Sequence, residues 1–293
     1  MSAATSLSYN RGVAENPNNL VAGRYRKRSL IGRGGAGTVY RALDTKEHRE
    51  VALKVLRGEL VADPVIAARF RREGRAIQLI DHPNIARLLD LGSTADGSLF
   101  LVLELVDGPS LADLIDSDGA FPLPRALRIL RQIAAALESA HSVGVVHRDL
   151  TSSNVGLTTG DQVKVFDFGL AKILGPEQRE VLSAPTGYTL GTPEYMAPEQ
   201  ITGEPLDRRV DLYSFGVIAF EVLTGTLPFH GDAVAVFRAH INTEPTPPSR
   251  AAGRALPPAL DRLVLRCLTK YPEQRFDDAG EILQQLEVLA REP

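Results

Sequence analysis

The most informative segment of this chain reads His147-Arg148-Asp149-Leu150-Thr151-Ser152-Ser153-Asn154, and Asp167-Phe168-Gly169 begins thirteen residues after Asn154. The two segments place Asp149, Asn154 and Asp167 on two short loops. Transfer of a phosphoryl group from a nucleotide requires a group that handles the proton of the accepting hydroxyl, and oxygen ligands that hold a metal ion on the phosphates. The types and spacing of these three residues therefore predict a phosphoryl-transfer site.

The composition is that of an ordinary globular protein, with 293 residues, of which 44% are hydrophobic and 24% charged. A formal net charge of -3 gives no electrostatic reason to expect a nucleic acid or an anionic membrane as a partner. The apolar runs are far too short to span a membrane, and the N-terminus has no signal-peptide stretch. The single Cys267 has no intrachain disulfide partner. We therefore expect a cytoplasmic protein without a nucleic-acid partner or a membrane segment.

Changes of pattern divide the chain into four parts. Residues 1–22 are rich in Ser, Asn, Gly and Pro without an apolar period, which is typical of a flexible tail. Residues 23–106 alternate as strands with one helix, residues 107–110 contain the breakers of a hinge, and residues 111–293 have mostly helical periodicity. These features predict an α+β fold of two lobes with a cleft between them. The smaller lobe is an antiparallel β-sheet with one key helix, and the larger lobe is mainly helical.

The segment Ile31-Gly32-Arg33-Gly34-Gly35-Ala36-Gly37-Thr38-Val39 has the spacing G-x-G-x-x-G-x-V. The same glycine spacing opens the helix of a dinucleotide-binding fold. Here β-branched and aromatic residues follow Gly37, so a strand is expected and no helix N-terminus is available for a pyrophosphate. A hairpin tip without side chains lets backbone N–H groups approach a triphosphate closely. We therefore expect the phosphates of a nucleotide beneath this hairpin.

Lys54 lies on a strand, Val51 to Leu56, whose alternation puts it on the same face as Ala52 and Leu56. Such a lysine either extends to solvent or finds an acidic partner. The helix that follows begins at Asp63-Pro64, and its buried stripe contains Glu73 among Ile66, Phe70, Ile77 and Ile80. A carboxylate on a buried stripe is costly unless a cation meets it. The pattern therefore predicts an ion pair between Lys54 and Glu73.

Taken together, the motifs resemble a eukaryotic-type serine/threonine protein kinase domain, in the style of its bacterial members, over about residues 24–290. Six ordered motifs carry the resemblance: the glycine segment, Val51-Ala52-Leu53-Lys54, Glu73, His147 to Asn154, Asp167-Phe168-Gly169 and Ala197-Pro198-Glu199. Asp211 to Gly216 is similar to the helix that anchors the catalytic loop, and Arg275 stands where the family has a partner for Glu199. Gly191 to Gln200 looks like the serine/threonine branch.

This resemblance implies transfer of the γ-phosphoryl of ATP to serine or threonine hydroxyls of protein substrates, with Mg²⁺, or alternatively Mn²⁺, on the phosphates. Asp149 would orient or accept the proton of the hydroxyl, Glu73 would hold Lys54, and Asn154 and Asp167 would bind the metal. His147 would pack beneath Phe168, in line with Ile77 and Leu88. The implied nucleotide-binding residues are Ile31, Gly32, Gly34, Gly37, Val39, Ala52, Lys54, Leu103, Glu104, Val106, Asn154 and Asp167.

The adenine would lie against Val39 and Ala52, with backbone groups of residues 104–106 as hydrogen-bond partners and Leu103 controlling access behind it. The family has a large apolar side chain beneath the adenine, where this chain has Gly156. Either the floor is partly missing, or a small bulge brings Leu157 or Val155 into the gap.

A second departure is Thr151, which stands where related enzymes have a lysine that neutralises the transferred phosphoryl group. We expect slow but real transfer, unless Lys164 or Lys172 supplies the charge. The alternative is a pseudokinase-like nucleotide-binding scaffold with weak or no turnover. A small-molecule phosphotransferase of related fold is disfavoured by Ala197-Pro198-Glu199, which serves protein substrates in the family.

The loop between Asp167 and Glu199 carries candidate phosphate acceptors, namely Thr186 and Thr189, with Ser183 as a further one. Arg148, next to Asp149, marks the subgroup in which a phosphate on this loop pairs with arginine. The resemblance therefore implies autophosphorylation, with a transient homodimer as a candidate partner. Ser153 stands where some relatives have an acidic residue that reads basic substrates, so no such preference is implied.

Overall fold

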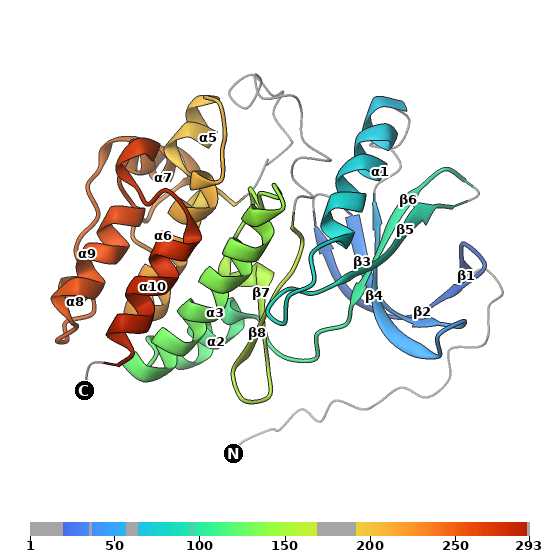
Figure 1. Cartoon of the computed structure of the whole chain (residues 1–293), viewed down its shortest axis with the longest axis horizontal. Coiled ribbons are helices and arrows are strands. Elements are labelled where there is room, and N and C mark those ends of the chain that lie inside the picture. The colour runs from blue at the N-terminus through green and yellow to red at the C-terminus, as the bar shows by residue number, and fades with distance from the viewer. Residues whose placement is uncertain (1–19, 35–36, 57–63, 95, 169–191, 292–293) are drawn as a thin grey trace, which may run out of the picture.

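The structure is a computed structural model that describes residues 20–34, 37–56, 64–94, 96–168 and 192–291. It has a β-sheet lobe and a larger helical lobe, joined by residues 105–110 between the last strand of the sheet and the first helix of the helical lobe (Figure 1). The predicted two-lobed α+β fold is confirmed. Across the described ranges, no helix combines the length and the apolar character that a membrane span requires.

The small lobe is a six-stranded sheet in the order β1-β2-β3-β4-β6-β5, with every neighbouring pair antiparallel. Its strands are β1 (Leu20–Val21), β2 (Tyr25–Gly34), β3 (Gly37–Asp44), β4 (Arg49–Leu56), β5 (Leu88–Ser93) and β6 (Leu99–Glu104). The sheet begins within the predicted tail, because Val21 is buried and Leu20 pairs with Arg26. The rest of the predicted tail, residues 1–19, lies outside the described residues.

The alternation predicted for β4 is the one observed. Val51 and Leu53 belong to a small core on one face of the sheet, whereas Leu56 joins the main core on the other face. Helix α1 (Pro64–Gln78) packs against β5, with Phe70 and Ile77 buried. This is the predicted key helix, it contains Glu73, and it lies in the sheet lobe (Figure 1).

The helical lobe is built around a central helix whose residues are buried from Val210 to Leu223. A helix that is apolar all round is stable only inside a core. Its helices are α2 (Leu111–Asp118), α3 (Leu123–Ser142), α5 (Pro198–Thr202), the central α6 (Arg209–Thr224), α7 (Ala233–Asn242), α8 (Pro248–Ala251), α9 (Pro258–Cys267) and α10 (Ala279–Leu289). Short 3-10 turns accompany them, namely η3 (Ser152–Asn154), η4 (Pro193–Tyr195) and η5 (Pro272–Gln274).

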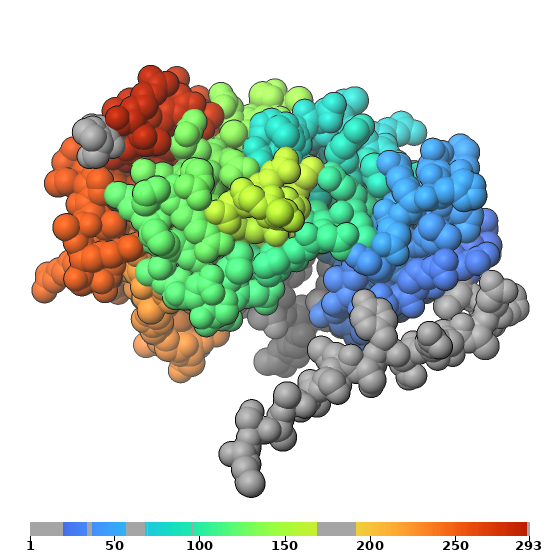
Figure 2. Space-filling view, turned by 90° about the horizontal axis from the view of Figure 1, so that it is seen from below, coloured from blue at the N-terminus to red at the C-terminus, as the bar shows by residue number. Residues whose placement is uncertain are grey.

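The transition from the connection to the helical lobe is fixed by a capping box at the start of α2. The Ser110 hydroxyl accepts a hydrogen bond from the Asp113 N–H, and the Asp113 side chain accepts from the Ser110 N–H. A two-stranded hairpin, β7 (Val155–Thr158) and β8 (Gln162–Val165), completes this part of the fold. In the space-filling view its yellow-green atoms lie between the sheet lobe and the helical lobe (Figure 2).

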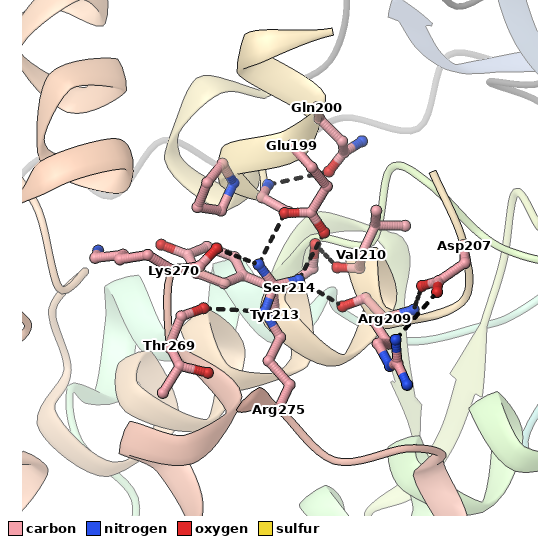
Figure 3. Close-up of polar contacts among 12 residues, drawn as sticks. Glu199, Gln200, Asp207, Arg209, Val210, Tyr213, Ser214, Thr269, Lys270 and Arg275 are labelled. Carbon is pink, nitrogen blue, oxygen red and sulfur yellow. Dashed lines mark hydrogen bonds and ion pairs between the residues drawn. The ribbon is translucent and has the colours of Figure 1, made fainter. Parts of the chain in front are cut away.

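A buried ion pair joins Glu199 at the start of α5 to Arg275 before α10 (Figure 3). The guanidinium Nη1 and Nη2 atoms lie 2.6 and 2.8 Å from the two carboxylate oxygens. The remaining N–H groups donate to the carbonyl oxygens of Thr269, Arg209 and Lys270 at 3.0 to 3.1 Å. This confirms the predicted pairing of Arg275 with Glu199. All the donors of the arginine are satisfied, which makes its burial tolerable.

We expect Glu199→Ala to lower the free energy of unfolding by roughly 3–5 kcal/mol, because it leaves the fully buried Arg275 charge without its carboxylate. Denaturant unfolding of the whole chain, followed by circular dichroism, measures this. Asp277→Ala is the control, since it removes the partner of Arg209 in an ion pair of which the Asp277 side chain is 68% exposed. That variant should lose at most about 1 kcal/mol. Equal losses in the two variants would contradict the importance of the buried pair.

Candidate active site

The loop that contains Asp149 is held by one buried carboxylate, that of Asp211 in the first turn of α6. The backbone N–H groups of His147 and Arg148 each donate to Asp211 at 2.8 Å. His141 Nε2, on α3, lies 2.8 Å from the same carboxylate. Arg148 has a φ of 68°, a left-handed conformation that is costly for a residue other than glycine. The two hydrogen bonds to Asp211 hold the loop in this conformation.

The electrostatics of Asp211 agree with this anchoring role. Complete burial opposes ionisation, but the hydrogen bond and charge of His141, the charge of His147 and the backbone N–H of Arg148 outweigh it. The pKa of Asp211 is therefore below its ordinary value. The carboxylate remains ionised and can accept all three hydrogen bonds at neutral pH.

His147 connects the loop to the segment that contains Asp167. Its ring lies 4.7 Å from the Phe168 ring, centroid to centroid, and its Nε2 atom lies 2.9 Å from the carbonyl oxygen of Phe166. Phe168 in turn lines a small apolar space together with Ile77 and Leu88. The predicted packing of His147 against Phe168 is therefore confirmed, and His147 acts as a buried packing residue in the fold.

Asn154 ties the same two segments together from the other side. Its side-chain Nδ2 donates to the Asp149 carbonyl at 2.8 Å, and its own carbonyl accepts from the Phe166 N–H at 3.0 Å. The hydrogen bond of Nδ2 leaves Oδ1 as the free oxygen of this amide. Asp167 follows with a φ of 66°, again left-handed. The fold thus brings Asp149, Asn154 and Asp167 into one site, as the sequence predicted.

The oxygen donors at this site suit a hard divalent cation. Asn154 offers an amide oxygen and Asp167 a carboxylate whose side chain is 26% exposed. Mg²⁺ is bound through one or two carboxylates together with phosphate and water oxygens, and needs no cage of protein ligands. The described residues contain no group of three His, Cys, Asp or Glu side chains placed to hold a metal ion. The pair therefore fits a metal ion that arrives with a phosphate.

Lys54 lies in this site, but its partner differs from the predicted one. Its Nζ atom is 2.7 Å from Asp167 Oδ2, with only 10% of its side chain exposed. No ion pair between Lys54 and Glu73 is formed within the described part of the chain; Glu73 Oε1 lies 2.8 Å from Arg72 Nη2. The negative charge of Glu73 also acts on Arg148. The prediction of a Lys54–Glu73 pair is wrong for this conformation, because Asp167 projects toward the ammonium and Glu73 meets arginines.

The environment of Asp149 shifts the pKa of its carboxyl upward. Burial raises the pKa of its carboxyl above the ordinary value, and the negative charge of Asp167 adds to that effect. The positive charges of His147 and Lys54 and the backbone N–H of Thr192 oppose it. A raised pKa in a cleft is typical of a group that exchanges protons in a reaction.

The glycine segment forms the predicted hairpin between β2 and β3, with Gly34 opposite Gly37. Gly37 is required by close packing, since a Cβ atom there would lie 2.3 Å from the carbonyl oxygen of Val55 on β4. Ile31 on the same hairpin is 53% exposed. In the register of the sheet, Val39 pairs with Lys54. The strand that follows the glycine segment is therefore the direct neighbour of the strand that carries Lys54.

The adenine side of the predicted nucleotide site lies where the sheet meets the connection. Ala52 on β4 pairs with Leu103 on β6, and β6 ends at Glu104. The side chain of Glu104 lies 2.8 Å from Lys164 on β8. Val106 follows in the connection. The residues predicted to surround an adenine are thus brought to one end of the cleft, with the two lobes on either side of it.

Neither alternative for the region below the adenine is observed. β7 pairs with β8 in continuous register from Val155 to Thr158, so there is no bulge at Gly156. A Cβ atom on Gly156 would lie 2.9 Å from Phe166 Cε1 and 2.9 Å from Val106 Cγ1. The space for a side chain at this position is therefore filled by its neighbours. Sequence reasoning missed Phe166, although a large aromatic residue immediately before Asp167 was a usable signal.

Thr151 is buried, and its carbonyl accepts a hydrogen bond from the Asn154 N–H at 3.0 Å. Of the two lysines considered as replacements for its missing charge, Lys164 is paired with Glu104 near the connection. Lys172 and the candidate acceptors Ser183, Thr186 and Thr189 lie outside the described residues.

A second feature missed in the sequence is a buried polar network beneath the catalytic loop. The Ser152 hydroxyl lies 2.7 Å from the Tyr195 hydroxyl, which donates to Glu221 Oε2 at 2.7 Å. Burial raises the pKa of Glu221 above its ordinary value, against the hydrogen bonds from Tyr195 and Ser152. The network joins the loop to η4 and α6. No spacing in the sequence signals it, because its members are far apart along the chain.

Comparisons with known proteins identify the family of this chain. Residues 25–286 match the family described as the protein kinase domain. The chain is 40% identical over 278 residues to serine/threonine-protein kinase pkn3 of Myxococcus xanthus, a match that covers 93% of this chain and 51% of the relative. It is 43% identical over 268 residues to serine/threonine-protein kinase PksC of Streptomyces coelicolor, covering 89% and 48%. The chain thus spans about half the length of these curated relatives.

Among solved structures, the chain is similar to the PknI kinase domain of Mycobacterium tuberculosis. The TM-score is 0.72 at 26% sequence identity, and the match covers 94% of this chain and all of that one. The kinase arrangement of two lobes is therefore shared with a crystal structure.

We expect the same substitution to have opposite effects on stability at the buried Asp211 and the half-buried Asp149. Asp211→Asn should lower the free energy of unfolding at pH 7 by roughly 3–5 kcal/mol, because it breaks a buried charge network. Since the folded pKa of Asp211 is lowered, its contribution is present above the unfolded pKa and is lost as the pH falls through the folded one. Thermal melts of the whole chain at pH 7 and at lower pH measure both effects.

Asp149→Asn should instead raise the melting temperature at pH 7. The folded pKa of Asp149 is raised, so its ionised form opposes folding above that pKa, and the advantage of the variant shrinks as the pH falls toward the unfolded value. Destabilisation by Asp149→Asn at neutral pH would contradict this description of the site.

Proposed function

We propose that this chain, which belongs to the protein kinase domain family, transfers the γ-phosphoryl group of ATP to serine and threonine hydroxyls of proteins. The observation that carries the proposal is the pair of hydrogen bonds by which Asn154 ties Asp149 to the segment leading into Asp167. A proton-handling carboxylate and two metal-ligand oxygens thereby share one cleft. Because the chain spans about half of its curated relatives, the substrates and partners of the whole protein are part of the proposal.

The reaction assigns one task to each group. Asp149, while ionised, orients the hydroxyl of the substrate and accepts its proton as the oxygen attacks the γ-phosphorus. Lys54 binds the α- and β-phosphate oxygens, and Glu73 supports it when it leaves Asp167. Asn154 and Asp167 would hold Mg²⁺, or Mn²⁺ in its place. The metal ion supplies positive charge that neutralises the phosphates, so the protein itself contributes positioning and electrostatic stabilisation.

The nucleotide would enter between the lobes, with its phosphates beneath Gly32, Gly34 and Gly37 of the hairpin. Its adenine would lie against Val39 and Ala52, near Leu103 and the backbone of residues 104–106. Ile31, half exposed at the hairpin, would cover the outer edge of the base. The strand register supports this placement, because Val39 pairs with Lys54 and Ala52 pairs with Leu103. The residues proposed for the phosphates and those proposed for the base are therefore neighbours in the sheet.

One of the two observations that suggested the pseudokinase alternative no longer supports it. Gly156 suggested a defective adenine site, but its space is filled by Phe166 and Val106. Thr151 remains as the departure that lowers the rate. Lys54, Glu73, Asp149, Asn154 and Asp167 are all present, and we therefore favour slow turnover over a scaffold without activity.

We further propose that the loop between Asp167 and Glu199 is regulated by phosphate. Arg148 has a half-buried guanidinium whose Nε is without a hydrogen-bond partner in the described structure. Burial lowers the pKa of this arginine, while Asp211 and Glu73 oppose the shift. A phosphate on Ser183, Thr186 or Thr189 would satisfy it. Transfer between two copies requires a transient homodimer. We place the reaction in the cytoplasm, where ATP is available and the buried thiol of Cys267 stays reduced.

Incubation of the whole chain with labelled ATP and Mg²⁺ should label it, and Asp149→Asn should reduce the initial rate by about 100-fold or more, because the proton acceptor is lost. Phosphopeptide mapping of the labelled protein should place the label on Ser183, Thr186 or Thr189. The control is Asp161→Asn, which lies just before β8, removes a carboxylate bound to Arg125 on α3 and should keep its activity. Equal labelling of the native chain and Asp149→Asn would contradict the catalytic assignment.

Restoring the missing charge should accelerate the reaction. We expect Thr151→Lys to raise turnover by about 10- to 1000-fold, because an ammonium at this position neutralises the transferred phosphoryl group. Thr151→Met provides a side chain of similar length without the charge and should give no gain. Initial rates on a generic protein substrate at saturating ATP measure the difference. If neither variant gains activity while both remain folded, the charge is supplied from another residue.

A further inference from the structure

We propose that Phe166 forms the apolar surface beneath the adenine of the nucleotide, a task that residue 156 cannot perform in this chain. The inference rests on the proposed use of ATP and extends it to a residue that determines how the base is bound. The observation behind it is that Gly156 has no side chain and that the ring of Phe166 occupies the space where such a side chain would lie.

The position of Gly156 places it below the base end of the cleft. It forms an isolated bridge with Ser110, and the Leu157 N–H donates to the Pro109 carbonyl at 3.0 Å. β7 is therefore bonded directly to the segment that follows Val106. A side chain on Gly156 would point between the lobes, at the level of the connection.

The same point in space is contacted by two other side chains. A Cβ atom added to Gly156 would meet Phe166 Cε1 and Val106 Cγ1, each at 2.9 Å. Contacts closer than about 3 Å are not tolerated in close-packed interiors, so the edge of the Phe166 ring already occupies this place. Phe166 is only half-buried, so part of its ring remains uncovered by protein. An apolar ring that is half-covered beside Val106 suits the planar face or edge of a purine.

The direction of the ring is fixed by the backbone on both sides. The Phe166 N–H donates to the Asn154 carbonyl at 3.0 Å, and its carbonyl lies 2.9 Å from His147 Nε2. These bonds belong to the same network that positions the catalytic loop. The base-binding ring and the metal ligand Asp167 are therefore adjacent on one rigid segment, so a change of base contact is transmitted over a single residue to the phosphate end.

The chain offers a direct optical test, because it contains no tryptophan. Phe166→Trp introduces a single indole at the proposed base site. Phe229→Trp introduces one in the helical lobe, where Phe229 packs against His240 with ring centroids 5.0 Å apart. We expect ATP and Mg²⁺ to change the fluorescence of Phe166→Trp saturably and to leave that of Phe229→Trp unchanged.

Binding measurements on the whole chain by titration calorimetry complete the test. Stacking on an aromatic ring contributes enough that Phe166→Ala should weaken ATP binding by about 10- to 100-fold. Gly156→Leu should also weaken it, because its side chain meets Phe166 and Val106. The combined Gly156→Leu and Phe166→Ala variant should bind more tightly than either single variant, since the leucine then fills the place that the ring leaves.

The outcomes separate the two proposals. If the native chain binds ATP, while Phe166→Ala binds equally well and the indole of Phe166→Trp does not respond, the role of Phe166 is overturned and the nucleotide site stands. If the native chain does not bind ATP, the proposed function is overturned, and the inference falls with it. Thermal melts check that each variant is folded, and Phe166→Leu, the mildest change, gives the same ordering of affinities if Phe166→Ala does not fold.

Discussion

The interaction on which the site depends is the acceptance of two backbone N–H groups by the buried carboxylate of Asp211. Through it, the first turn of α6 fixes His147 and Arg148, although Arg148 is in a left-handed conformation that it would avoid in isolation. The carboxylate is stable there because His141 and the N-terminal end of a helix both favour its charge. The single buried charge of Asp211 thereby fixes the conformation of the catalytic loop relative to the central helix α6.

Backbone hydrogen bonds connect this anchored loop to the second loop, which contains Asp167. His147 meets the carbonyl of Phe166 and Asn154 meets its N–H, so the residue before Asp167 is held on both sides. Two features of this arrangement lower the stability of the fold: the left-handed backbone of Asp167 and the environment that raises the pKa of Asp149. Both are typical of sites in which function, not stability, selects the arrangement.

The sequence alone predicted the contacts that depend on a single helix or strand, or on a motif whose partner is fixed. The two faces of β4, the stripe of α1 and the pairing of Arg275 with Glu199 all follow from such patterns. It was insufficient where two partners compete. Periodicity puts Glu73 on the buried side of α1, but whether Lys54 meets Glu73 or Asp167 depends on how the helix lies relative to the cleft. Gly156 was understood only as a missing side chain, because the contact with Phe166 arises from strand pairing that brings two loops together.

The ion pair of Lys54 with Asp167 bears on how ATP gains its affinity. In the proposed reaction, both groups would leave a partner of opposite charge when the nucleotide binds, since the phosphates would take the ammonium and the metal ion would take the carboxylate. Lys54 is already nearly removed from water, so the exchange replaces one set of buried charge contacts with another and its net contribution is small. The apolar contacts of the adenine do not have to replace an existing ion pair of the protein. In the proposed ATP complex of this chain, the surface around the adenine, with Phe166 in it, would therefore supply the binding free energy, and the charged groups would serve mainly to place the phosphates for transfer.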